Sequence, residues 1–302
     1  MPKRVLAYLS ALGAAIFYSL NQIFNKRVVL ALGTLPALAL VYGILTALDF
    51  LLCLLFGDFF VPSPKVLFEI VLLSAVGAVS ILTLFESFKY LPIGVSITLA
   101  NLSPVFLTLL VFLFTGKLPP LPKLGVIALL LFAVYLITSD TSAGEKGERK
   151  SKKGVYLLPL VTALGWAIFG WETFRLLNIY NLDIFALAFY TSFYMFAVFA
   201  AALLAAYGWG NVKFLLKKVF IDKKVLKWAF IGGVLTSGGF ILSMLPFKWV
   251  PPDETPVIEA IFTTTTPLSA LFSYLLLGER LSKRQIIGIA LAFTALMLFF
   301  VL

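Results

Sequence analysis

Long apolar runs recur along the whole chain and are separated by short polar connections. We expect ten of them, near residues 5–24, 36–56, 67–88, 94–115, 123–139, 154–174, 184–207, 228–247, 256–277 and 285–302. Each is about as long as the ~20 apolar residues that a helix needs to cross the hydrocarbon core of a bilayer. The runs are apolar on all sides rather than at alternate positions, which favours helices over the strands of a barrel. The pattern predicts an all-α integral membrane protein with ten transmembrane helices.

Two polar stretches interrupt this rhythm. Residues 140–153 read DTSAGEKGERKSKK and are typical of a linker, so we expect two five-helix units at residues 1–139 and 154–302. Residues 211–227 place apolar side chains among six lysines, which predicts an amphipathic helix, or a basic loop, on anionic lipid headgroups. A solvated basic loop is the alternative for this second stretch.

The two units share short matches in the same order along the chain. The matches are ALGAAIF at 11–17 with ALGWAIF at 163–169, FKYLP at 88–92 with FKWVP at 247–251, and Pro104 and Gly116 with Pro267 and Gly278. Three ordered matches indicate a duplication. Because each unit has an odd number of crossings, five, the second enters the membrane from the opposite side. Such inverted repeats are the plan of many secondary transporters, in which a shared midplane site opens alternately to each side.

The repeat also bears on the first apolar run, which follows Lys3 and Arg4 as a cleavable signal peptide would. Its repeat partner lies in the middle of the chain, where no signal peptide occurs. We therefore expect the first run to be a structural helix.

Composition narrows the possible functions further. Hydrophobic residues make up 61% of the chain and charged residues 13%, too few charges to coat a water-soluble enzyme of this size. One cysteine, Cys53, and no histidine exclude an intrachain disulfide, a Cys/His zinc site and histidine-based nucleophilic catalysis. The net charge of +10 does not indicate nucleic acid, because the basic residues lie between apolar runs.

The basic residues also bear on orientation. Of the 24 Lys and Arg residues, seven fall on the face of the termini: Lys3, Arg4, Lys65, Lys117, Lys123, Arg175 and Lys248. The remaining seventeen fall on the face of the linker. The positive-inside rule thus predicts that both termini lie outside and the linker inside.

The end of the chain resembles a known family. The stretch TTTTPLSALFSYLLLGERLSKRQIIGIAL, with a proline in mid-helix, GE followed by a basic residue and then Gly288, resembles the ten-helix EamA-like family of the drug/metabolite transporter superfamily. The resemblance covers both halves. It implies a five-plus-five bundle that moves small organic solutes without ATP, and termini in the cytoplasm, opposite to the prediction from charge. The first half departs from the pattern, with Lys117 where the second has Glu279.

Polar side chains inside the spans are the candidate site, because such groups are costly against lipid. In the first helix Tyr18, Asn21 and Asn25 share one face, with Lys26 just beyond. This row is suited to a polar solute, with Lys26 meeting a carboxylate or phosphate. Alternatively the asparagines join helices and Lys26 extends to the interface.

Acidic residues are the candidates for proton coupling, because a desolvated carboxylate can take up and release protons as access alternates. Glu86 in the third helix is the candidate of the first half, with a local ion pair to Lys89 as the structural alternative. Glu172 in the sixth helix has Arg175 three residues further on. Asp49 lies deep in the second helix, and the sequence names no partner for it.

The ninth helix places Glu259, Thr263, Thr266 and Pro267 along one face, as a cavity wall would. In the fourth helix Asn101 and Pro104 are expected to line the opposite wall, or Pro104 bends the helix to make room for a neighbour.

The function that these features favour is a secondary transporter, an exporter or exchanger of small organic metabolites such as amino acids or drugs, with proton coupling as an option. The alternative is a flippase for lipids or amphiphiles on the same scaffold. The sequence does not support an enzyme or an ATP-driven pump, since it contains none of the enzyme motifs HExxH, GxSxG and GxGD and no ATP-binding GxxxxGK[ST] loop. A channel would not explain the inverted repeat. We expect a multi-pass protein of the cell (inner) membrane, monomeric or homodimeric, whose partners are a small-molecule substrate and the bilayer, with no cofactor or metal.

Overall fold

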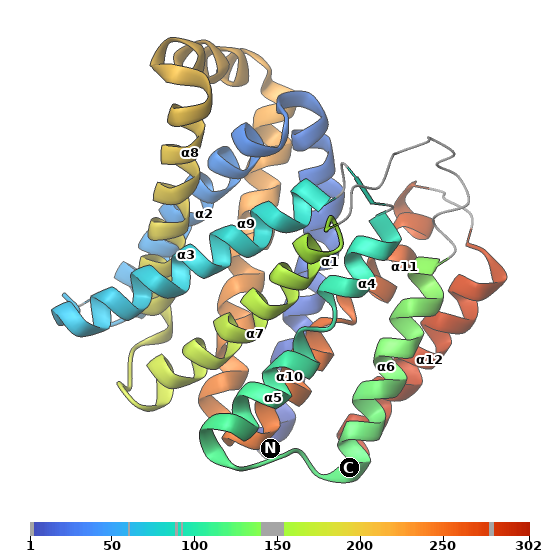
Figure 1. Ribbon diagram of the computed structural model, residues 1–302. Coiled ribbons are helices and arrows are strands. Elements are labelled where there is room, and N and C mark those ends of the chain that lie inside the picture. The colour runs from blue at the N-terminus through green and yellow to red at the C-terminus, as the bar shows by residue number, and fades with distance from the viewer. Residues whose placement is uncertain (1–2, 60, 88–89, 92, 140–153, 278–280) are drawn as a thin grey trace.

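The computed structural model describes residues 3–302 except 60, 88–89, 92, 140–153 and 278–280. Its described secondary structure is entirely helical (Figure 1). The first half contains α1 (Lys3–Leu32), α2 (Thr34–Phe56), α3 (Pro64–Ser87), α4 (Ile93–Ala100), α5 (Ser103–Thr115) and α6 (Leu121–Ser139). Glycines permit the tight connections here, because Gly33 between α1 and α2 has φ 86° and Gly116 after α5 has φ 67°.

The second half repeats this series of helices. It contains α7 (Leu157–Asn178), α8 (Ile184–Ile221), α9 (Lys223–Trp249), the short 3₁₀ helix η2 (Pro252–Glu254), α10 (Thr255–Phe262), α11 (Thr265–Leu277) and α12 (Lys283–Val301). Nine segments of the described chain are long and apolar enough to cross a membrane, with the end of α4 and α5 counted as one. Together α10 and α11 make a tenth, so the chain is a ten-span membrane protein, as the sequence predicts.

The packing of the helices repeats when the two halves are exchanged. Helix α1 lies along α9, and correspondingly α7 lies along α3, while α2 pairs with α8 and α6 with α12. Single residues follow the same rule. Ser10 of α1 donates to the carbonyl oxygen of Leu242 at 2.9 Å, and their repeat counterparts Thr162 and Thr83 have hydroxyl oxygens 2.9 Å apart.

The two halves run in opposite directions across the bundle. Figure 1 shows both termini at one end, which we call the terminal end, and the opposite end is the linker end. Helix α6 begins at the terminal end, whereas α12, its counterpart, finishes there (Figure 1). This opposition confirms two inverted five-helix repeats. The predicted linker at 140–153 lies outside the described residues, so the limits of the two units stay a prediction.

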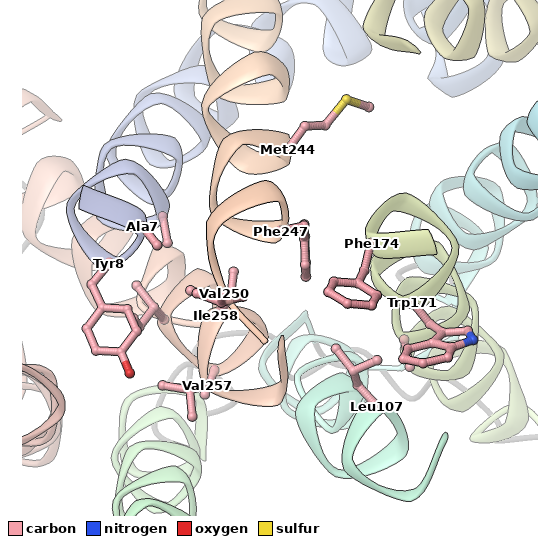
Figure 2. Close-up of a cluster of buried hydrophobic side chains, with 14 of the residues drawn as sticks. Ala7, Tyr8, Leu107, Trp171, Phe174, Met244, Phe247, Val250, Val257 and Ile258 are labelled. Atoms are coloured by element: carbon pink, nitrogen blue, oxygen red, sulfur yellow. The ribbon is translucent and has the colours of Figure 1, made fainter. Parts of the chain in front are cut away.

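The terminal end is filled by apolar side chains from both halves. Figure 2 shows side chains from α1, α5, α7, α9 and α10 converging there. Trp171 and Phe174 of α7 stack with ring centroids 5.6 Å apart, and Phe247 of α9 and Leu107 of α5 are buried beside them. We call this cluster of buried apolar side chains the apolar plug.

The basic segment near residue 211 is helical. Helix α8 is interrupted at Gly208, where φ is 69° and ψ is 158°, and then continues to Ile221. Val212 and Val219 are buried while Trp209 is 70% exposed. The result favours the amphipathic helix over the basic loop.

Candidate functional site

A row of polar side chains joins α1 to α9 across the two repeats. Asn21 donates through Nδ2 to Thr236 Oγ1 at 2.8 Å, and Tyr18 Oη lies 3.3 Å from Ser243 Oγ. The Thr236 hydroxyl itself donates to the carbonyl of Gly232, which fixes Asn21 as the donor in the first contact. The amide oxygen of Asn21 is therefore directed elsewhere, and it is buried without a hydrogen-bond partner.

Asn25 continues this row toward the linker end. Its Oδ1 is buried without a partner and lies close to Gly232, where an added Cβ would come within 2.6 Å of that oxygen. A small cleft opens beside it, formed by the linker-end parts of α1, α2 and α3 and lined by Asn25, Val29, Ala37, Leu38, Val41 and Phe85. The row thus leads from the bundle interior to a cleft at one end.

Two broken helices meet in the interior. Helix α4 ends at Ala100 and α5 begins at Ser103, while α10 ends at Phe262 and α11 begins at Thr265. Each break precedes a proline, Pro104 or Pro267, whose missing N–H and ring bulk prevent a regular helical turn there. The prediction of one continuous helix for each of these runs is wrong, although each run does form one apolar span, because hydropathy does not register the backbone geometry.

The breaks place polar groups of both repeats opposite one another. Asn101 donates through Nδ2 to Thr266 Oγ1 at 3.0 Å, and Ser103 donates to Glu259 Oε1 at 2.8 Å. Glu259 is 7% exposed and forms no ion pair among the described residues. A Cβ on Gly170 of α7 would lie 3.5 Å from Glu259 Oε2, so the carboxylate sits against α7 directly beside the apolar plug.

Ionic contacts close the terminal end. Glu254 of η2 forms an ion pair with Lys123 of α6, and Tyr8 of α1 donates to Glu254 Oε2 at 2.5 Å. Lys123 also donates to Tyr8 Oη at 3.1 Å, and Arg4 Nε lies 3.7 Å from Glu254 Oε1. This buried cluster joins the first repeat to the second.

A second ionic cluster lies at the same end. Arg175 of α7 pairs with Glu172 at 2.8 Å and lies 3.8 Å from Glu69 of α3, which accepts a hydrogen bond of 2.8 Å from Tyr180. All ion pairs among the described residues therefore lie at the terminal end. With the apolar plug, they seal that end, whereas the cleft is at the linker end.

Comparison with known proteins identifies the scaffold. The model of the EamA-like transporter family matches residues 5–139 and again residues 152–301. The chain belongs to the EamA-like transporter family. A solved crystal structure, described only as that of a protein, has the same fold with a TM-score of 0.75 at 15% identity, over 97% of this chain and 95% of that one. No curated protein matches the sequence.

Not all predicted site residues of this EamA-like transporter come together. Tyr18, Asn21, Asn25, Asn101, Glu259 and Thr266 face the interior between the repeats. Thr263 is buried, and its hydroxyl donates to the carbonyl of Ala260 in its own helix. Its predicted place on one face with Glu259 and Thr266 stays a prediction.

The predicted charged residues have the following surroundings. Glu86 is half-buried on α3 and accepts a hydrogen bond of 3.4 Å from Tyr90, and its role in coupling stays a prediction. Glu172 is held in the ion pair with Arg175. Lys89 lies outside the described residues, as does the side chain of Lys26, so the predictions for these two lysines stay open.

Several polar residues of the site were not predicted from the sequence. Thr236, Ser237 and Ser243 lie in a glycine-rich part of α9, where small residues let helices approach closely, and that composition is the signal that could have found them. Lys123 was counted only among the basic residues on the face of the termini, and its burial, at 2% exposure, was not predicted. Within the described chain, no group of three His, Cys, Asp or Glu is placed to hold a metal ion.

Proposed function

We propose that the protein is a secondary transporter that exports or exchanges small organic metabolites by alternating access. Membership of a transporter family supports transport of small molecules. The observation that carries the proposal is the set of polar contacts between the repeats, where Asn21 meets Thr236 and Ser103 meets Glu259. Contacts at the junction of inverted repeats are remade as one repeat moves against the other.

The proposed solute carries hydrogen-bond donors. The amide oxygens of Asn21 and Asn25 are buried without a partner, and Glu259 has no cation beside it among the described residues. Buried acceptors without donors are costly, so an N–H or O–H group of a solute stabilises them. Amino acids and other amine-bearing metabolites meet this requirement. In this proposal Glu259 either binds the solute or exchanges its proton for it.

The test is uptake and counterflow in proteoliposomes, with a broad panel of metabolites and with and without a pH gradient. We expect counterflow of at least one donor-bearing solute by the parent protein, and at least a tenfold loss in Asn21→Ala. Glu259→Gln is expected to lose accumulation driven by the pH gradient. Asp183→Asn is the matched control, because Asp183 caps the start of α8 by accepting from the backbone N–H of Ala186, and it should transport normally.

Two results would contradict this proposal. A requirement for ATP by the purified protein would exclude secondary transport. Full gradient-driven transport by Glu259→Gln would exclude coupling through this carboxylate.

A lipid or amphiphile flippase is the second candidate, favoured by the amphipathic helix after Gly208 with its exposed Trp209 and Lys213. Such a helix lies in the membrane interface and draws on anionic lipid. Movement of a labelled lipid between leaflets of the same vesicles, without solute counterflow, would favour this function over the first.

A further inference from the structure

A second buried carboxylate lies apart from the Glu259 site. Asp49, in the C-terminal half of α2, is 1% exposed and faces α8 and α9 of the other repeat. Its Oδ1 accepts a hydrogen bond of 2.5 Å from Ser237 of α9. Its Oδ2 is buried and has no hydrogen-bond partner. Ser192 of α8 faces the same carboxyl group.

No positive charge compensates this carboxylate among the described residues. Asp49 takes part in none of the ion pairs there. The titratable groups in electrostatic range are Tyr18 of α1 and Tyr42 of its own helix, and both are phenols. From the described side chains of α8 and α9, the groups that face Asp49 are the hydroxyls of Ser192 and Ser237.

A bare carboxylate in such a place is energetically unfavourable. Removing an ion from water costs several kcal/mol even after the protein relaxes, unless an opposite charge or several donors compensate. The hydroxyl of Ser237 bonds Oδ1, but that of Ser192 donates to the carbonyl of Phe189, so Oδ2 stays without a donor. A proton on Oδ2 removes the charge, so the dry arrangement fits the neutral acid, whereas water or movement of the helices is needed to stabilise the anion.

A purely structural role accounts for only part of the geometry. The hydrogen bond from Ser237 does tie α2 to α9, but a neutral asparagine could accept the same bond without the cost of a buried charge. An ionisable residue within a membrane span is expensive and is expected to have a function.

The position of Asp49 in the fold suits coupling to movement. Helix α2 of the first repeat packs against α8 and α9 of the second, so Asp49 lies where the repeats must shift against one another. Tyr18 is in electrostatic range of both Asp49 and Glu259 and also belongs to the polar row. A change of charge at Asp49 therefore reaches the helix that carries the proposed solute site.

We propose that Asp49 is a proton-binding site, separate from Glu259, which holds a proton while the α2–α8–α9 interface is closed and releases it to water when that interface opens. The proton moves between water and Oδ2, and no other bond changes. This inference rests on the proposed function, because it gives the transporter its coupling step.

The first test needs no solute. Infrared spectra of the purified protein in lipid, recorded across a pH titration, resolve the C=O stretch of protonated carboxyl groups. We expect a band that persists at neutral pH in the parent, is missing in Asp49→Asn and is kept in Asp183→Asn. Asp183 is the matched control, since it caps the start of α8 by accepting from the backbone N–H of Ala186 at 3.0 Å.

Ser237→Ala provides a second variant if Asp49→Asn does not fold. It removes the hydroxyl that donates to Oδ1, so the Asp49 band should shift while that of Glu259 stays. An unchanged spectrum in Asp49→Asn, or in Ser237→Ala where only that variant folds, would overturn the proposal.

The second test uses a solute identified by counterflow. Asp49→Asn is expected to keep counterflow within about twofold of the parent and to lose at least tenfold in accumulation driven by a pH gradient. Unchanged accumulation would overturn the coupling role. Absence of counterflow by the parent with every solute would instead count against the proposed function, and the infrared spectra would still decide whether Asp49 binds the proton.

Discussion

At the residue scale, the buried cluster at the terminal end is most sensitive to loss of a single charge. Glu254 is 7% exposed and is the partner of Lys123, which is 2% exposed. Removing one member of a buried ion pair leaves the other charge uncompensated, which typically costs about 3–5 kcal/mol. We predict that Glu254→Gln destabilises the protein by about 3 kcal/mol, measured as a lower Tm of the purified protein in one fixed detergent.

Two further variants separate this charge effect from general damage. The double variant Lys123→Met, Glu254→Met removes both charges and should recover most of the lost stability, because apolar residues of similar volume can replace a buried pair. Arg4→Met should change Tm little, since the Arg4 side chain is 42% exposed. A Tm of Glu254→Gln equal to that of the parent would contradict the prediction.

Gly232 offers a residue-scale test of the polar row. A Cβ at this position would lie 2.6 Å from Asn25 Oδ1 and 3.3 Å from Asn21 Oδ1, so both amides must shift. Misplacing binding groups by about 1 Å can cost two orders of magnitude in rate. We predict that Gly232→Ala lowers the initial rate of counterflow at least tenfold. Gly125→Ala, whose Cβ would meet nothing within 4 Å, is the matched control, and an equal loss there would remove the argument.

At the element scale, the two proline-associated breaks create the meeting point of the repeats. At the second break the N–H of Thr264 bonds the carbonyl of Ile261 at 3.0 Å, so the turn is tighter than a regular helix. Pro267→Ala supplies an N–H that can bond the carbonyl of Thr263, four residues earlier.

We predict that Pro267→Ala straightens α10 into α11, draws Thr266 away from Asn101 and lowers counterflow at least tenfold without lowering Tm. Pro122→Ala is the control, because Pro122 lies in the first turn of α6, where its missing N–H is not needed. Normal transport by Pro267→Ala would show that the break is not required.

The sequence predicted the membrane-spanning helices better than the contacts between residues of different helices. Hydropathy alone located ten spans, and the spacing of Tyr18, Asn21 and Asn25 correctly placed them on one face, because these signals are local. The contacts of Asp49 with Ser237 and of Lys123 with Glu254 join residues more than one hundred positions apart. No local pattern encodes such approaches, so the buried network at the terminal end and the role of α9 became visible only in the fold.

At the scale of the whole molecule, the two ends of the bundle differ. The terminal end is sealed by the apolar plug and the ionic clusters, and the linker end has the cleft beside Asn25. Alternating access requires that this asymmetry reverse during transport.

We predict how fast a membrane-impermeant maleimide labels one cysteine near each end. Phe85→Cys lines the cleft and should be labelled rapidly from the linker side. Val257→Cys lies in the apolar plug and should be labelled much more slowly from the terminal side. Both variants are made in a Cys53→Ala background, which removes the single native cysteine. Added solute should raise labelling of Val257→Cys. Equal labelling at both positions without solute would contradict a sealed terminal end.

Orientation decides which compartment the cleft faces, and two arguments oppose each other here. The sequence predicts that seventeen of the 24 basic residues lie on the face of the linker, so the positive-inside rule places that end in the cytoplasm, whereas resemblance to the family implies cytoplasmic termini. We predict from the charges that alkaline phosphatase fused at Leu302 is active outside and that a fluorescent protein inserted within 140–153 fluoresces inside. The cleft would then face the cytoplasm, the side from which an exporter takes up its solute. A fluorescent fusion at Leu302 would reverse the orientation and make the observed arrangement the one that faces outward, in which an exporter releases its solute.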